Sequence, residues 1–212
     1  MGTIYLIRHG ETPWNQQARY QGQMDIELSE QGLRQAGFLG KRLQNFPLAA
    51  IYSSDLNRAH QTAVTIAQYH GLDVPKDPRL RETHFGVWEG LTRDEIKQVY
   101  PDLFRQRYSA AGQAAIPGAE SPHAVQDRML AALGGLARTH AGETIAVVSH
   151  GGAMRLVFCS ILGIPLDEAY RFRMYNTSLS ELAAATDSEG VHWSIRSIND
   201  TSHLQRQEVI GH

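Results

Sequence analysis

The N-terminal stretch Ile4-Tyr5-Leu6-Ile7-Arg8-His9-Gly10-Glu11-Thr12-Pro13-Trp14-Asn15 shapes the interpretation of the whole chain. It begins as a short apolar run rich in β-formers, which is typical of a buried strand, and Gly10 and Pro13 then turn the chain into a loop. In an α/β sheet, ligands bind at the carboxyl ends of the strands. We therefore expect this strand to deliver a cation, Arg8, and an imidazole, His9, to a binding site.

His9 has the chemistry of a nucleophile that needs neither a metal ion nor an organic cofactor. An unperturbed imidazole titrates near about pH 6.5 and is largely neutral at pH 7, so its ring nitrogen can attack phosphorus or a carbonyl carbon. The adjacent Arg8 favours an anionic target, since a guanidinium offers phosphate a fork of N–H donors. On this stretch alone, a half-buried structural histidine fits equally well.

The size and charge of the chain limit its partners. Its 212 residues are enough for one well-buried domain over 1–212, with an ordinary composition of 42% hydrophobic and 20% charged residues. The formal net charge of −2 provides no basic field for nucleic acid or for a membrane surface. We expect a small-molecule ligand, and the sequence leaves a homodimer open.

The single cysteine and the lack of long apolar segments favour a cytoplasmic protein. Cys159 cannot form an internal disulfide, and it lies in an apolar helical segment where we expect it to pack. No apolar run approaches about 18 residues, and the N-terminus leads directly into the first strand rather than through a signal peptide.

The order of the expected elements is that of an α/β protein. Strands are expected at 4–8, 49–54, 143–149, 179–185 and 192–198, and helices at 29–46, 56–70, 93–100, 103–109, 121–139 and 154–162. This alternation predicts a three-layer α/β/α sandwich with a mostly parallel central sheet. Residues 73–91 are expected to be loop, with at most a short strand around 74. Residues 92–121 are expected to form a small helical cap insertion, in which 110–121 is a candidate lid.

A second expected strand ends as the first one does. The run from 143 to 149 is followed by His150, Gly151 and Gly152. Because the carboxyl ends of parallel strands meet at one edge of a sheet, we expect His9 and His150 to flank one pocket. The glycines let a ligand approach backbone N–H groups, and a following helix N-terminus favours an anion.

A third candidate is Arg58, at the point where the second strand gives way to a helix. In the first helical turn an arginine is electrostatically unfavourable by itself, and a bound anion would compensate. An exposed surface arginine is the alternative.

The stretch from 79 to 90 supplies carboxylates. A carboxyl group beside bound phosphate is repelled by the substrate's charge and partly desolvated, and both effects raise a pKa. A carboxylic acid that is protonated near neutral pH can protonate a leaving alkoxide. Glu82 and Glu89 both qualify, and their spacing does not choose between them.

A zinc site is the alternative use of these histidines. His9, His84 and His150 are available, but the sequence has no His-x-x-x-His helix pair and no cysteine cluster. We therefore expect neither a metal ion nor another cofactor.

Five motifs together resemble the histidine phosphatase superfamily, the phosphoglycerate-mutase-like proteins. They are Arg8-His9-Gly10-Glu11-Thr12 with Trp14-Asn15, Gln21-Gly22, Tyr52-Ser53-Ser54-Asp55-Leu56-Asn57-Arg58-Ala59 with Gln61-Thr62, Glu82-Thr83-His84-Phe85-Gly86-Val87-Trp88-Glu89-Gly90, and Ser149-His150-Gly151-Gly152. They follow the family's order from Ile4 to about Thr201.

The resemblance implies a role for each candidate residue. His9 would become phosphohistidine, while Arg8, Arg58 and His150 would hold the phosphoryl oxygens. Glu82 would protonate the leaving oxygen and later activate water. Phosphate or substrate would be contacted by Thr12, Asn15, Gln21, Gly22 and the N–H of Gly151. No metal is needed, because two arginines and a second histidine supply the positive field.

Within the family, the chain resembles the phosphatases more than the mutases. Mutases carry Arg-His-Tyr-Gly after the glutamate, a longer insertion and paired adjacent arginines, whereas here Gln106 separates Arg105 from Arg107. A short cap leaves the pocket open to water, which favours hydrolysis. We expect a metal-independent phosphomonoesterase. Phosphoglycerate mutase is the alternative, and a non-catalytic phosphate sensor is disfavoured because no catalytic candidate is missing.

The substrate is less sharply defined. The segment from 198 to 204 resembles the tail of metal-independent phosphoserine phosphatases, so phosphoserine is the first candidate. The alternatives are α-ribazole phosphate, a sugar phosphate or a phosphoglycerate. We expect the specificity residues between 93 and 122, where Arg105, Arg107 and Tyr108 are candidates.

Overall fold

The computed structural model describes residues 1–107 and 115–205, and in these residues it contains a five-stranded sheet of order β2-β3-β1-β4-β5. Strands β1 and β3 pair in parallel, as do β2 and β3, whereas β4 is antiparallel to both β1 and β5. Four of the five strands therefore run in one direction, and the predicted mostly parallel sheet is confirmed. The strands are β1 (Gly2–Arg8), β2 (Leu48–Ser53), β3 (Thr144–Ser149), β4 (Leu179–Thr186) and β5 (Val191–Asp200).

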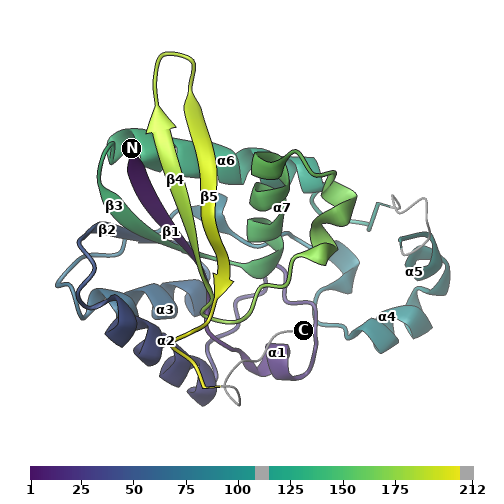
Figure 1. Cartoon of the computed structure of the whole chain (residues 1–212). Coiled ribbons are helices and arrows are strands. Elements are labelled where there is room, and N and C mark those ends of the chain that lie inside the picture. The colour runs from purple at the N-terminus through teal and green to yellow at the C-terminus, as the bar shows by residue number, and fades with distance from the viewer. Residues whose placement is uncertain (108–114, 206–212) are drawn as a thin grey trace.

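Helices cover both faces of the sheet, as Figure 1 shows. Successive residues of a strand point to opposite faces, so Leu6 packs with the helices of one layer and Ile7 with those of the other. The predicted three-layer sandwich is confirmed. One layer consists of α2 (Glu30–Leu43) and α3 (Asn57–Ala67), and the opposite layer consists of α6 (Pro122–Thr139) and α7 (Gly151–Leu162).

The helices differ in whether a side chain caps their first turn. Ser29 caps α2 as predicted, since its side chain accepts a hydrogen bond from the Gly32 N–H at 3.0 Å. The N-cap residues of α3 and α7 are Leu56 and His150, and within the described structure neither side chain caps its helix. Helix α7 begins at Gly151 rather than at the predicted residue 154. Its first N–H groups therefore lie directly beside His150.

Residues 73–91 are mostly loop, as predicted, and no strand forms around residue 74. A single parallel bridge joins Ser53 to Lys76, and the chain continues through two 3-10 turns, η1 (Pro78–Leu80) and η2 (Gly86–Trp88). The two prolines at 75 and 78 explain this, because proline cannot donate to a strand ladder. The sequence also did not predict the short helix α1 (Pro13–Gln16) or the 3-10 helix η3 (Leu166–Arg171).

Two short helices lie beside the sandwich, α4 (Arg93–Val99) and α5 (Pro101–Arg107) (Figure 1). An ion pair between Arg19 and Glu95 at 2.7 Å connects α4 to the loop that follows α1. These helices occupy the place predicted for the cap insertion.

The predicted lid segment lies partly outside the described residues, which omit 108–114. The part that follows is bonded to the loop carrying Glu82. The Val87 N–H donates to the Pro117 carbonyl at 3.1 Å, and the Glu120 N–H donates to the His84 carbonyl at 2.9 Å. Gly86 permits this close approach, because a Cβ there would lie 2.0 Å from the Pro117 oxygen. Residues 117–120 are therefore fixed to the loop that carries Glu82.

Within residues 1–107 and 115–205, none of the helices combines the length and the apolar character that a membrane crossing requires.

Candidate active site

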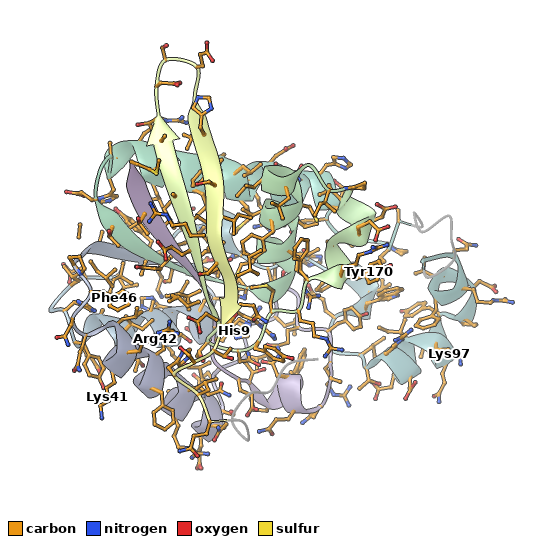
Figure 2. All side chains as sticks on the ribbon, in the orientation of Figure 1. His9, Lys41, Arg42, Phe46, Lys97 and Tyr170 are labelled. Carbon is orange, nitrogen blue, oxygen red and sulfur yellow. The ribbon has the colours of Figure 1, made fainter. Side chains whose placement is uncertain are left out.

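A pocket of about 410 Å³ opens at the carboxyl ends of the parallel strands, a size typical of sites for small molecules. Figure 2 shows His9 at this end of the sheet. Eight of the ten predicted site residues line the pocket: Arg8, His9, Asn15, Gln21, Gly22, Arg58, Glu82 and Gly151. The other two, Thr12 and His150, are completely buried behind its wall.

The sheet register brings the two histidines together. Arg8 pairs with Ser149 across β1 and β3, and the His9 N–H donates to the Ser149 carbonyl at 3.0 Å. The next residues in each chain segment are the two site histidines, and the centroids of their rings lie 5.1 Å apart. The two histidines that were predicted to flank one pocket therefore lie side by side, with His9 in its lining and His150 buried behind it.

The contacts of His9 define its tautomer. Its Nδ1 lies 2.6 Å from the Gly10 carbonyl oxygen, which can only accept a hydrogen bond. We therefore assign the proton to Nδ1, which leaves the lone pair on Nε2. Burial, with the nearby charges of Arg58 and Arg8, lowers the pKa of His9 well below its ordinary value. The ring is neutral at pH 7, as a nucleophile requires.

His150 has the complementary arrangement. Arg58 Nε donates to its Nδ1 at 3.2 Å, so the proton of the neutral ring is on Nε2. This Nε2 is buried, and no described residue is its hydrogen-bond partner. Burial and the charge of Arg58 lower the pKa of His150 well below its ordinary value. His150 therefore presents an unused N–H donor next to the His9 ring.

Arg58 is fully buried, so the alternative of an exposed surface arginine is wrong. Besides His150, its guanidinium donates to the carbonyls of Gly22 and Met24, both at 2.7 Å. Burial lowers the pKa of Arg58 to about 10, which leaves it cationic at neutral pH. The residue thus brings a positive charge to the pocket and fixes the loop that forms its wall.

Arg8 supplies a second buried cation. It donates through NH1 to the Met174 carbonyl, while its Nε is shielded from solvent and has no hydrogen-bond partner among the described residues. Burial lowers its pKa to about 10, so it too stays charged at neutral pH. A buried cation with an unused donor is suited to an anionic ligand.

The structure distinguishes the two glutamates that the sequence left open. Glu82 lines the pocket, and its carboxylate accepts hydrogen bonds from the N–H groups of Gly152 at 3.0 Å and Ala153 at 2.8 Å, in the first turn of α7. Glu89 instead accepts from the backbone N–H groups of Gln23 and Phe85. Glu89 therefore stabilises the loops around the site, and Glu82 faces its interior.

The loop after β1 is shaped by its own side chains. Thr12 caps α1, and it forms a reciprocal capping box with Asn15. This places Asn15 in the pocket wall and keeps Thr12 out of it. Gly22 has a φ of +53°, and a Cβ there would lie 1.8 Å from a Glu89 oxygen, so the wall at this point requires glycine.

Several lining residues were not predicted. Arg155 lies four residues after Gly151 on α7, and helical spacing could have found it once the helix start was known. Asn176 donates to the His9 carbonyl at 3.1 Å from a segment with no local signal. The others are Trp14, Ala18, Arg19, Tyr20, Phe85, Arg93 and Gly152. With five arginines and one carboxylate, the lining is strongly cationic.

The expected specificity residues are not where the sequence suggested. Arg105 is exposed on α5, where it pairs with Asp102, and it does not line the pocket. The Arg107 side chain and Tyr108 lie outside the described residues. Of the region between 93 and 122, Arg93 does line the pocket.

In the part of the chain that the structure describes, no group of three or more His, Cys, Asp or Glu side chains is arranged to hold a metal ion.

The fold and this cationic histidine site agree with the comparison to known families. Residues 4–201 match the histidine phosphatase superfamily (branch 1). The chain belongs to this superfamily, as its motifs predicted, and it is a phosphoric monoester hydrolase.

Its relatives carry different activity names. The chain is 35% identical to phosphoserine phosphatase 1 of Hydrogenobacter thermophilus over 212 residues, which cover 100% of this chain and 99% of the relative. It is 39% identical to the probable phosphoglycerate mutase GpmB of Yersinia pestis over 204 residues, covering 95% and 94%.

Solved structures share the whole fold. YhfR of Bacillus stearothermophilus superimposes with a TM-score of 0.87 at 37% identity, covering 97% of this chain and 100% of that one. A mutant phosphoserine phosphatase of Entamoeba histolytica, in complex with phosphoserine, gives 0.84 at 28% identity, covering 97% and 100%.

Proposed function

We propose that the protein hydrolyses small phosphate monoesters without a metal ion, through a phosphohistidine intermediate on His9. The observation that carries this proposal is the pairing of two neutral histidines with opposite tautomers. His9 offers an Nε2 lone pair, and His150 offers an Nε2–H donor. A nucleophile next to a donor for the group it attacks is what phosphoryl transfer needs.

In the first step, His9 Nε2 attacks phosphorus and the bond to the ester oxygen breaks. Arg8, Arg58 and His150 hold the equatorial oxygens, and they supply the positive field that Mg²⁺ supplies in other phosphoryl-transfer sites. Glu82 gives its proton to the leaving oxygen.

In the second step, water attacks the phosphohistidine. The Glu82 carboxylate accepts a proton from that water, the phosphorus–nitrogen bond breaks, and inorganic phosphate leaves with His9 restored. Asn15, Gln21, Gly22 and the Gly151 N–H line the same space and would contact phosphate or substrate. Thr12 serves by orienting Asn15.

Phosphoserine is the proposed substrate. The support is the similarity to two proteins named phosphoserine phosphatase, one over the full chain and one in complex with phosphoserine. Phosphoglycerate mutase is the second candidate, because the chain is 39% identical to a protein named a probable mutase. Supplying 3-phosphoglycerate with 2,3-bisphosphoglycerate tests the mutase, which would produce 2-phosphoglycerate.

The general activity is tested with p-nitrophenyl phosphate in the presence of EDTA. The proposed enzyme continues to release p-nitrophenolate, a metal-dependent enzyme stops, and a non-catalytic sensor shows no turnover at all. A panel of phosphomonoesters, followed by released phosphate, then ranks phosphoserine against sugar phosphates and α-ribazole phosphate. The cytoplasmic location, the single domain and the homodimer stay predictions.

A further inference from the structure

Arg155 lines the pocket, and the mechanism proposed above gives it no role. It lies on α7, four residues after Gly151 and three after Gly152, so its side chain projects from the face of the helix that borders the site. Its Nε is shielded from solvent and has no hydrogen-bond partner among the described residues. None of the ion pairs formed within 1–107 and 115–205 includes Arg155.

The other peripheral cations of the pocket are already engaged. Arg19 donates to the Gly90 carbonyl at 2.6 Å and pairs with Glu95. Arg93 stacks over the ring of Phe104, with its guanidinium carbon 5.5 Å from the centroid. A partly buried guanidinium without a partner is unfavourable. Of Arg19, Arg93 and Arg155, Arg155 is therefore the one whose charge a bound anion would balance.

Arg155 lies on the side of the pocket where the alcohol part of the substrate would leave. The carboxylate of Glu82 is held by the N–H groups of Gly152 and Ala153, one helical turn before Arg155. Burial lowers the pKa of Arg155, and the nearby negative charge of Glu82 partly offsets this. Because Glu82 is the proposed acid for the leaving oxygen, the group attached to that oxygen lies within the surroundings of Arg155.

We propose that Arg155 binds a carboxylate on the alcohol part of the substrate. This inference rests on the proposed function and narrows the substrate class to phosphate esters of small hydroxy acids, of which phosphoserine is one. A guanidinium suits this task, since its planar fork of donors matches the two oxygens of a carboxylate. Esters of uncharged alcohols would lose this contact but keep those of the phosphoryl group.

The test compares two substrates that differ only in the carboxylate. Phosphoserine carries it, and phosphoethanolamine is the same amino alcohol ester without it. We expect the wild type to prefer phosphoserine. Arg155→Met should lower kcat/KM for phosphoserine by about 10- to 100-fold and leave phosphoethanolamine within about threefold. Arg155→Lys keeps the charge but not the planar fork of donors, so its kcat/KM for phosphoserine should lie between those of the wild type and of Arg155→Met. The exposed Arg34→Met on α2 is the matched control.

Two results would overturn the inference. A wild type without preference for phosphoserine would do so, and so would an equal loss on both esters, which would place Arg155 on the phosphoryl group. Urea unfolding of each variant shows whether it is folded. If Arg155→Met is not folded, the two substrates are compared in Arg155→Lys instead. Failure of the proposed function itself looks different, because the wild type would then release no phosphate from either ester or from p-nitrophenyl phosphate.

Discussion

The imidazole rings of His9 and His150 lie 5.1 Å apart and are inclined by 58°, and they use their Nδ1 atoms in opposite ways. His9 donates from Nδ1 to the Gly10 carbonyl, whereas His150 accepts at Nδ1 from Arg58. As a result, one Nε2 is a nucleophile and the other is a donor. The parallel register of β1 and β3 brings them together, because it aligns Arg8 with Ser149 immediately before them.

The stability of the protein should depend on pH through these two buried histidines. Burial lowers the pKa of both well below their ordinary value, so below about pH 6.5 the unfolded chain binds more protons than the folded one. Stability therefore rises with pH across this window and is lost as the pH falls, by about 2–3 kcal/mol per unit below about pH 6 for two histidines. Urea titrations at about pH 7.5, 6 and 5 measure it.

A variant separates the contribution of one ring. His150→Gln cannot bind the proton, so the part of the slope that His9 and His150 contribute should fall by about half. His203, whose pKa burial lowers to about 4, adds a contribution that this variant leaves in place. Carboxylates do not obscure this window. Asp200, for example, has a pKa lowered to about 2 by its hydrogen bond from Arg42 and titrates at lower pH. A slope that His150→Gln leaves unchanged would contradict the account of a neutral buried pair.

Removal of the Arg58 guanidinium should damage both activity and fold. Arg58→Ala leaves three acceptors without their donor and removes a cation from the pocket, so we expect kcat/KM for p-nitrophenyl phosphate to fall by about 10³ and the free energy of unfolding by about 3 kcal/mol. Arg58→Lys should recover part of the activity. The exposed Arg34→Ala should change neither quantity, and wild-type activity in Arg58→Ala would count against the proposed phosphate site.

The two glutamates should respond differently to the leaving group. Glu82→Gln removes the proposed proton donor, so we expect kcat for phosphoserine to fall by about 10²–10⁴. The loss for p-nitrophenyl phosphate should be much smaller, because p-nitrophenolate leaves without a proton. Glu89→Gln should lower stability by about 1–2 kcal/mol through its bonds to Gln23 and Phe85, with the ratio of the two substrates unchanged. If the variants exchanged these behaviours, Glu89 would be the acid.

Arg128 should act on the reaction through the backbone that carries Glu82. Its guanidinium donates to the carbonyls of Arg79, Arg81 and Glu82 and to the Glu120 carboxylate. Arg128→Ala frees this segment, so kcat for phosphoserine should fall about tenfold with a smaller effect on p-nitrophenyl phosphate. The exposed Arg138→Ala on the same helix is the control. An equal loss on both substrates would indicate a general loss of structure instead.

The layers of the fold were predictable because each depends on local periodicity. The apolar run of β1 and the spacing of Val125, Met129 and Leu133 on α6 reveal buried faces without any knowledge of their partners. Parallel strands then place His9, Arg58 and His150 at one edge. Around residue 74 the sequence left a short strand open beside the loop, because Val74 stands directly before Pro75 and carries no period that separates strand from loop.

The finer points of the site depend on tertiary contacts. Nothing in the spacing of Glu82 and Glu89 shows that one carboxylate is held by the start of α7 and the other by a loop. Asn176 reaches His9 from a distant segment, which no local pattern encodes. Arg105 is cationic and in the expected region, yet it points into solvent, because a side chain's direction follows from how its helix packs.

The most direct test is a search for the covalent intermediate. The enzyme would be mixed with a phosphomonoester in a single turnover, quenched in base, where phosphohistidine survives, and digested for mass spectrometry. We predict a phosphoryl group on His9 in the wild type and in the exposed His123→Ala control, and its loss together with the activity in His9→Ala. Full hydrolysis by His9→Ala, or an active wild type that never carries phosphate on this residue, would contradict the account.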